Sequence, residues 1–307
     1  MYKNIYILNP TSGRSKSQDI FNKVKHVVKK EELVLTTTEK DQAYKVLSKI
    51  NLTNIDNIIG IGGDGTIKEI VEAVLENESK KNTLSIGHIP AGTGNGLASS
   101  ILFLNHKPYN LDNSIKPITN NEKKIQEIDI ACVKTEKNQY HSFLSLNVGF
   151  ISDLDILTEF LRFLGSFRYY LGAVWCLIWM KTFKITLNYL LDNDEWKKID
   201  DEFIVLWACN LSHPSFDVFI SPEIKFDDGY HHILLLRKDI SRWEMLMLLL
   251  NLDKGTVLNH PKALYIKTKK YEVKIKSKDA IVSIDGEKVE DMDYKIEILN
   301  KRLNILI

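Results

Sequence analysis

An apolar strand that runs directly into a glycine-rich turn is the feature that most restricts how this 307-residue chain can fold. Ile58 to Ile61 has the pattern of a buried strand, and Gly62-Gly63-Asp64-Gly65 forms a turn before a helix that starts near Ile67. Glycines let the backbone take positive φ and approach a ligand closely, and a helix start offers N–H groups to an anion. Asp64 either caps the helix, or it accepts a proton from a hydroxyl that attacks a phosphoryl group or helps to hold Mg²⁺.

The first third of the chain repeats this alternation of strand and helix. It predicts a parallel sheet with ligand-binding loops at the carboxyl edge, where the Asn9–Ser17 loop, the turn at Asp64 and the Pro90–Gly96 loop should meet. Thr38 has the position of a helix cap, and Thr66 and Glu69 have the spacing of a capping box. The expected strands are Ile5–Leu8, Leu33–Leu35, Asn57–Ile61 and Leu84–Ile89.

A segment rich in Asn and Pro, from about Asn105 to Asn121, is typical of a crossing between domains. We therefore expect a nucleotide-binding α/β domain over residues 1–115 and a second domain over 116–307. Short strands with turns between them predict a β-sandwich for the second domain, interrupted by two helical inserts near residues 156–180 and 241–250. The strands expected there are Ile125–Val133, Tyr140–Leu146, Phe183–Leu191, Phe203–Ala208, His232–Arg237, Tyr265–Lys269, Tyr271–Lys276, Ile281–Ile284 and Tyr294–Leu299.

Composition excludes several classes of protein. A formal net charge of +1 argues against a nucleic-acid binder that works through bulk charge. Cys132, Cys176 and Cys209 are widely spaced, which predicts a reducing compartment without a disulfide framework or a zinc site. The most apolar stretch, Tyr169–Met180, is shorter than the roughly 20 residues that a spanning helix needs, so we expect a cytoplasmic protein for which peripheral membrane contact remains open.

Six motifs together resemble the diacylglycerol kinase superfamily of lipid kinases, and most of all the sphingosine kinases, over nearly the whole chain. The resemblance implies an α/β N-terminal domain of the NAD kinase/diacylglycerol kinase type, with a parallel sheet, and a C-terminal β-sandwich that binds lipid. It also implies that MgATP phosphorylates the primary hydroxyl of a sphingoid base, with ceramide or diacylglycerol as the alternative substrate. The motifs are Leu8-Asn9-Pro10, Gly62–Gly65, Pro90–Asn95, Ser145–Gly172, Ser221–Gly229 and Asp285-Gly286-Glu287.

The same resemblance implies roles for single residues. Asp64 corresponds to the general base, and Arg162 and Arg168 to the side chains that hold the nucleotide's phosphates, although both arginines also fit a snorkelling surface position. Glu287 falls near the metal or the nucleotide, or simply in an exposed hairpin turn. Ser15 stands where a glycine is usual, and the metal ligands are not assigned. The remaining nucleotide contacts implied are Asn9, Thr38, Gly62, Gly63, Gly65, Gly92, Thr93, Gly94, Asn95, Asp285 and Gly286.

Ser145 and Asp155 correspond to positions that contact the lipid head group. Because Asp155 is anionic, it favours a substrate with an ammonium beside the reacting hydroxyl, as in a free sphingoid base. Ile151, Leu154 and Tyr169 flank these residues and are expected to line the acyl-chain pocket. The apolar run from Phe160 to Trp179 either extends that pocket or packs in the core. The expected partners are a lipid, transient membrane contact and a second copy of the chain, with no nucleic acid.

Overall fold

The chain forms two compact units in the computed structural model, which describes residues 3–29, 32–120, 123–158 and 167–307. The first unit comprises residues 1–128 and 302–307, and the second comprises residues 129–301. The chain passes between them in β5 (Ile125–Lys134) and again in β15 (Asp293–Leu306). The boundary therefore lies later than the expected 115/116, and the last residues return to the first unit because the end of β15 adds a strand to its sheet.

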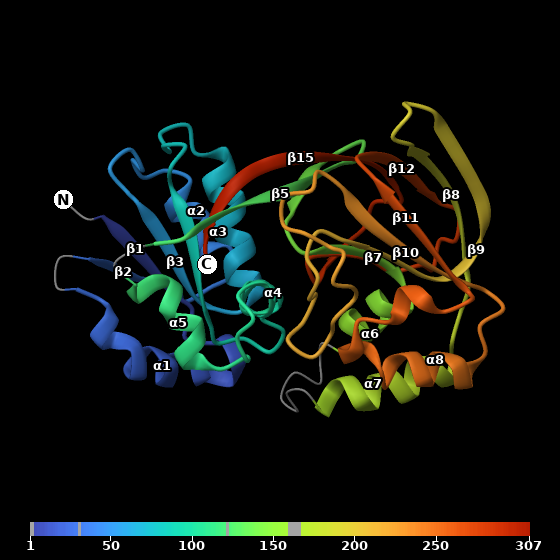
Figure 1. The fold of residues 1–307 in the computed structure, drawn as a ribbon, viewed down its shortest axis with the longest axis horizontal. Helices are drawn as coiled ribbons and strands as arrows, with labels where there is room; N and C mark the ends of the chain where they lie inside the picture. Colours follow the sequence, from blue (N-terminus) through green and yellow to red (C-terminus); the bar gives the residue numbers. More distant parts are fainter. Residues whose placement is uncertain (1–2, 30–31, 121–122, 159–166) are drawn as a thin grey trace. The chain divides into compact units, whose positions relative to one another are not determined.

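The first unit contains the predicted parallel sheet, in the order β2-β1-β3-β4-β15 (Figure 1). Every neighbouring pair in it is parallel, and β3 pairs with β1 on one side and β4 on the other. β3 and β4 lie in the middle of the sheet, and both are therefore buried along their whole length. The other strands are β1 (Asn4–Leu8), β2 (Leu33–Thr36), β3 (Asn57–Gly62) and β4 (Ser85–Pro90).

Helices cover both faces of this sheet. α1 and α5 pack against the face that carries Tyr6 and Ile59. α3 packs against the opposite face, where Gly60 leaves room for it, since a Cβ there would lie 2.6 Å from Ile67 Cδ1. The segment expected to be a crossing is instead helix α5, whose first turn is capped by the Asn110 side chain. The helices are α1 (Ser12–Val24), α2 (Gln42–Leu47), α3 (Asp64–Glu76), α4 (Gly96–Leu104) and α5 (Leu111–Thr119).

The second unit is rich in antiparallel strands, which confirms the predicted fold class. β9 is its longest strand, and it pairs with β7, β8 and β10. The strand expected over 140–146 is split into β6 and β7, and the short β14 was not expected. The strands are β6 (Gln139–Ser142), β7 (Ser145–Gly149), β8 (Phe183–Leu190), β9 (Trp196–Cys209), β10 (His231–Arg237), β11 (Ala263–Thr268), β12 (Lys270–Ile275), β13 (Val282–Ile284) and β14 (Glu287–Val289).

Two apolar clusters hold the second unit together, one on each face of β9. Leu206 and Ala208 belong to one cluster, and Val205 and Trp207 belong to the other, as the two-residue period of a strand requires. Three helices cover the Trp207 side, and α7 and α8 run next to each other there (Figure 1). They are α6 (Phe150–Leu157), α7 (Phe167–Ile178) and α8 (Arg242–Leu249).

Candidate active site

Three loops meet at the carboxyl edge of the first sheet, as the sequence predicts. Gly63 and Gly92 bring two of them into backbone contact, since a Cβ on Gly92 would lie 2.4 Å from Gly63 Cα. The third loop approaches in the same way, because a Cβ on Gly13 would lie 2.0 Å from the Ala91 carbonyl oxygen. These glycines therefore let the starts of α1, α3 and α4 gather at one edge, where helix N–H groups favour an anion.

The glycines of the Asp64 turn serve close approach rather than an unusual backbone conformation. Among the described glycines of the three loops, positive φ occurs at Gly13, at +55°, so the expectation of positive φ around Asp64 is wrong. Gly65 differs from Gly63 because a Cβ on it would meet nothing within 4 Å. The fold itself thus has no steric need for glycine at this exposed position, which leaves room for a ligand.

Asp64 is the first residue of α3, and its carboxylate caps a different helix. Oδ2 accepts the N–H of Gly96 at 2.9 Å and Oδ1 that of Leu97 at 3.4 Å, both at the start of α4. Burial raises the pKa of Asp64 from 3.8 to about 6, and these N–H groups oppose the rise. The carboxylate is charged at neutral pH but close to its own pKa, which suits a group that must take a proton during a reaction.

The side chains around Asp64 correct two predicted caps. Asn9 donates from Nδ2 to Thr66 Oγ1 at 3.2 Å, and the Glu69 carboxylate accepts the Ala43 N–H at 3.0 Å in the first turn of α2. Thr66 and Glu69 therefore do not form a capping box on α3, because each is bonded to another element. Thr38 is not the cap of α2 either, since the helix begins at Gln42 and the Thr38 N–H instead donates to the Gln42 side chain.

Asn95 closes the loop that follows β4. It has positive φ (+54°), and its side chain accepts the Gly92 N–H and donates to the Gly92 carbonyl, both at 2.9 Å. Nδ2 also lies 3.0 Å from the Tyr109 hydroxyl. Asn95 thus holds the loop in shape, with Thr93 and Gly94 partly exposed between its ends. Nucleotide contacts by Thr93 and Gly94 stay predictions.

His88 supports the Asp64 turn from beneath, and the sequence analysis missed it. Its side chain is buried in β4, and Nε2 lies 3.1 Å from the Gly62 carbonyl oxygen. Burial lowers the pKa of His88 to about 4, so the ring is neutral at pH 7 and Nε2–H is the donor. The signal available in the sequence was a single ionisable residue inside an otherwise apolar strand.

A buried polar strip lies beneath α6 in the second unit. Ser145 and Asn147 on β7 share it with Ser283 on β13, and Asn147 Nδ2 lies 3.5 Å from the hydroxyls of both serines. Ser152 on α6 adds a hydroxyl 3.2 Å from that of Ser283. Within the described part of the chain, Asn147 Oδ1 is buried without a hydrogen-bond partner. An unpaired buried acceptor is costly, so Asn147 is a candidate ligand-binding residue that the sequence analysis did not name.

α6 carries the residues predicted to recognise the lipid. Asp155 is half-buried, and burial raises the pKa of Asp153 to about 6, with Lys181 opposing the rise. Ile151 is buried, and Leu154 packs against α7 where a Cβ on Gly172 would lie only 2.8 Å from Leu154 Cδ1. Arg162 lies outside the described residues, and Arg168 and Tyr169 lie on α7 with side chains outside the description. The roles of these three residues stay predictions.

Asp285 forms an internal brace, and its predicted contact with the nucleotide stays a prediction. It is 5% exposed, and its carboxylate accepts the Ser142 hydroxyl at 2.6 Å and the N–H groups of Phe143, Leu144 and Ser145 at 2.9–3.2 Å. Asp285 and Gly286 have φ of +51° and +79° and form the two-residue turn between β13 and β14. Nucleotide contacts by Gly286 and Glu287 remain predictions.

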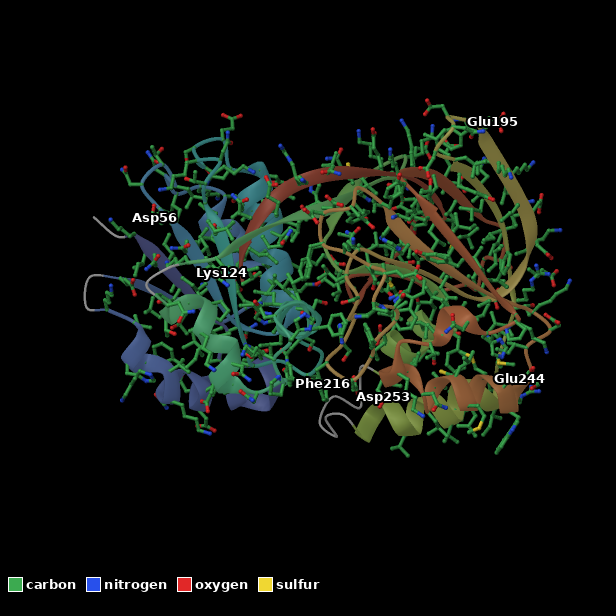
Figure 2. The ribbon with its side chains drawn as sticks, in the orientation of Figure 1. Asp56, Lys124, Glu195, Phe216, Glu244 and Asp253 are labelled. Atoms are coloured by element: carbon green, nitrogen blue, oxygen red, sulfur yellow. The ribbon has the colours of Figure 1, made fainter. Side chains whose placement is uncertain are left out.

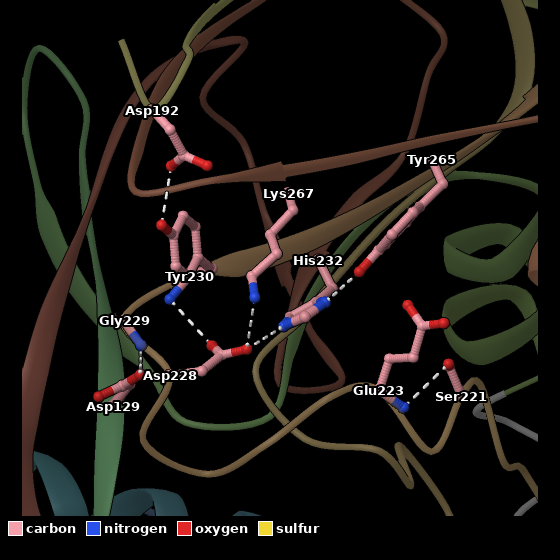
Figure 3. A network of polar contacts seen from close by, with 10 residues as sticks. All are labelled: Asp129, Asp192, Ser221, Glu223, Asp228, Gly229, Tyr230, His232, Tyr265 and Lys267. Atoms are coloured by element: carbon pink, nitrogen blue, oxygen red, sulfur yellow. Dashed lines mark hydrogen bonds and ion pairs between the residues drawn. The ribbon is translucent and has the colours of Figure 1, made fainter. Parts of the chain in front are cut away.

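The Ser221–Gly229 motif is held by a network of polar contacts in the second unit (Figure 3). The Asp228 carboxylate lies 3.1 Å from His232 Nε2 and 3.2 Å from Lys267 Nζ, and His232 Nδ1 lies 2.6 Å from the Tyr265 hydroxyl. Burial alone would raise the pKa of Asp228, but the contacts with His232 and Lys267 lower it below its ordinary value. The contacts of Asp228 with His232 and Lys267 therefore give this motif a structural role within the second unit.

The described residues contain no group of three or more His, Cys, Asp or Glu placed to hold a metal ion. That finding is compatible with Mg²⁺ delivered on a nucleotide, because Mg²⁺ is often held by one or two carboxylates together with phosphate oxygens. The open space at Gly65 and the gathered helix starts fit the phosphates of such a nucleotide. Asp64 is the carboxylate at that edge that would help to hold the ion.

Comparison with known proteins shows what this chain is similar to. Residues 3–133 match the diacylglycerol kinase catalytic domain. The fold agrees, because a diacylglycerol kinase structure from Bacillus anthracis superimposes with a TM-score of 0.70 at 19% identity, over 99% of this chain and 96% of that one. The two proteins therefore share a fold, with a parallel α/β unit followed by an antiparallel β-rich unit.

Relatives extend the similarity to most of the chain. Sphingosine kinase 1 of Arabidopsis thaliana is 24% identical over 93% of this chain and 68% of its own length. Sphingosine kinase 1 of Homo sapiens is 25% identical over 92% of this chain and 85% of its own length. Residues 3–133 thus carry a diacylglycerol kinase catalytic domain, and over most of its length the chain is similar to lipid kinases, which are phosphotransferases.

Proposed function

We propose that this kinase transfers the γ-phosphoryl group of MgATP to the primary hydroxyl of a sphingoid base such as sphingosine, and that it does so in the cytoplasm at a membrane surface. The observation that carries the phosphotransfer is Asp64, a half-buried carboxylate set among three glycine-dependent loops. A site that only bound phosphate would gain nothing from this negative charge. A base for the attacking hydroxyl explains it.

Each group at the carboxyl edge of the first sheet has a role in the proposed chemistry. The substrate hydroxyl has a pKa far above 7, so Asp64 takes its proton only as the bond to phosphorus forms. N–H groups at the helix starts, together with Asn9, Thr38 and the loop glycines, face the nucleotide's phosphates. Arg162 and Arg168 offer permanent charge and a planar fork of donors to the same phosphates.

The proposed substrate rests on the polar groups of α6 and β7. Asp155 offers a negative charge, and Asn147 Oδ1 offers a buried acceptor that has no described donor. A protonated amine is attracted to a carboxylate and donates to a free acceptor such as Asn147 Oδ1, whereas ceramide and diacylglycerol lack such an amine. The sphingosine kinase relatives support the same choice. Ser145 supports the head-group site, and Ile151, Leu154 and Tyr169 are proposed to contact the chain of the lipid.

A panel of lipids with labelled ATP tests this assignment. We expect sphingosine to be phosphorylated faster than ceramide or diacylglycerol. Asp155→Asn should lower kcat/KM for sphingosine about 10- to 100-fold, since a charge-assisted contact contributes about 1.5–3 kcal/mol, while leaving the KM for ATP within twofold. Asp194→Asn, an exposed turn residue of the second unit, is the matched control and should change neither.

The second candidate is a diacylglycerol kinase, which the match of residues 3–133 to that catalytic domain favours. The same panel decides between the two. Faster turnover of diacylglycerol than of sphingosine would remove the sphingoid assignment and leave the phosphotransfer by Asp64 intact.

A further inference from the structure

Helices α7 and α8 of the second unit turn large apolar side chains towards solvent. Eight of them are 37–67% exposed, and we call this set the α7–α8 face. The set includes three of the chain's five tryptophans. Its members are Leu171, Val174, Trp175, Ile178, Trp179, Trp243, Met247 and Leu250.

The spacing of these side chains puts them on one outward stripe of each helix. On α7 and the residue after it they recur at intervals of three and four residues, and the opposite side buries Cys176 and Leu177. On α8 and the residue after it, Trp243, Met247 and Leu250 form the stripe, and Met245 is buried behind them. Trp175 and Trp179 therefore belong to neither the core nor an internal pocket, which corrects the expectation from sequence.

The two stripes belong to one fixed surface. Arg242 at the start of α8 donates from Nε to the Leu177 carbonyl at 2.9 Å and from a terminal nitrogen to the Ile178 carbonyl at 3.3 Å. Glu244 lies in the first turn of α8, and Asp253 lies in the short 3-10 helix after its end (Figure 2), so charge flanks the stripe without interrupting it. None of the eight members is charged.

The face is too large to be ordinary surface. A large aromatic side chain presents on the order of 150–250 Å² when fully exposed, so eight large apolar side chains at these fractions present on the order of 700 Å². A patch of this size marks a partner surface on a monomeric protein. Its size alone would suit either a bilayer or a second copy of the chain.

We propose that the α7–α8 face docks the enzyme on a lipid bilayer, an inference that rests on the proposed function. Tryptophan with aliphatic side chains, on helices that lie along a surface, is the composition of a membrane interface. The α7–α8 face also adjoins the proposed lipid site, which favours a bilayer over a second copy of the chain. At Gly172, α7 packs directly against α6, which carries Leu154 and Asp155. A lipid that leaves the bilayer thus meets the head-group helix first. No helix among the described residues is long and apolar enough to cross the membrane, so docking is peripheral.

Binding to phosphatidylcholine vesicles tests the proposal. The variant with Trp175, Trp179 and Trp243 all changed to serine should lower the vesicle partition coefficient at least about 30-fold, since each loses apolar area that the bilayer would bury. The matched control is Trp196→Ser, which removes a half-exposed tryptophan from β9 and should stay within twofold. Leu250→Glu is a second, independent variant of the face and should weaken binding in the same direction.

Kinetics separate this proposal from the proposed function. The triple variant should phosphorylate a water-soluble short-chain sphingoid base at the wild-type rate and vesicle-borne sphingosine much more slowly. Wild-type vesicle binding by the triple variant would overturn docking, as would a lipid-free dimer that the three substitutions convert to a monomer. A wild-type enzyme that binds vesicles through this face but phosphorylates no sphingoid base would remove the proposed substrate and leave docking in place.

Discussion

Asp64 and Asp285 are both aspartates of a glycine-containing turn, and both accept backbone N–H groups, yet their surroundings differ. Asp285 is 5% exposed and receives a hydroxyl and three N–H groups of one short segment. Asp64 receives N–H groups of α4 at 2.9 and 3.4 Å, stands half-buried at the edge of the sheet, and has a pKa raised to about 6 by burial.

The difference separates a carboxylate that organises its own fold from one whose surroundings suit the proposed role of a base. Asp285 has its contacts supplied by its own unit, so its charge is satisfied before any ligand arrives. At Asp64, burial raises the pKa by more than the N–H contacts lower it, so the charged carboxylate is not fully stabilised by the protein. Open space at the neighbouring Gly65 leaves room for a ligand beside it. Similar sequence motifs therefore carry different tasks, and four predictions can break or sharpen this distinction.

The largest effect is expected from Asp64→Asn. Asparagine keeps the shape and one acceptor for the start of α4 but cannot take a proton, so kcat should fall about 10²- to 10⁴-fold while ATP affinity stays near wild type. Steady-state kinetics and calorimetric titration of ATP measure the two quantities. Asp19→Asn on the exposed side of α1 is the control. A variant with more than half of the wild-type kcat would rule out Asp64 as the base.

Asp285→Ala should act on stability instead. Removing the carboxylate leaves a buried hydroxyl and three N–H groups without their acceptor, which should lower the free energy of unfolding by about 3–4 kcal/mol in urea titration. Glu290→Ala, at an exposed position paired with Lys288, should cost at most about 1 kcal/mol. An Asp285→Ala protein with wild-type stability and a much raised KM for ATP would contradict the structural role and support the predicted nucleotide contact.

Much of this fold could be predicted because its signals are local. Apolar runs that end at asparagine, glycine or proline predicted β1, β3 and β4 and the edge where their loops meet. The failures have physical reasons in tertiary contacts. Glu69 caps α2 across the fold and not its own helix, and the strand expected over 140–146 divides where Asp285 binds the backbone. No local pattern encodes either contact.

The candidate site was predicted through its loops but not through its supports. Asp64 and its glycines stand out in the sequence because glycine has a special use. His88 and Asn147 do not, since a single polar residue in a strand gains meaning only when its partner, or the lack of one, is seen. Trp175 and Trp179 were expected inside, because sequence periodicity finds an apolar stripe but not the direction in which it faces.

The raised pKa of Asp64 predicts a pH dependence of stability with a definite sign. The pKa is about 6 in the folded chain against an ordinary 3.8, so the folded state binds the proton more tightly. The contribution of Asp64 to the free energy of unfolding is therefore largest at low pH, and it is lost as the pH rises from about 4 to 6. Relative to Asp64→Asn, the wild type should lose at most about 3 kcal/mol across that window in urea titrations at each pH. An unchanged difference between the two proteins from pH 4 to 7 would contradict the raised pKa.

The smallest effects are expected from alanine substitutions of Gly65 and Gly286, which follow Asp64 and Asp285 in the two turns. Gly65 lies in helix α3 with φ that any residue adopts and with nothing within 4 Å of an added Cβ, so Gly65→Ala should raise the free energy of unfolding by about 0.5–1 kcal/mol. Gly286 also has open space, but its φ is +79°, so Gly286→Ala should lower that free energy by about 1 kcal/mol. If nucleotide phosphates occupy the space at Gly65, the added methyl group in Gly65→Ala should raise the KM for ATP. Urea titration of both variants and ATP kinetics of Gly65→Ala measure these effects, and a wild-type KM for ATP in Gly65→Ala would show that Gly65 does not face the nucleotide.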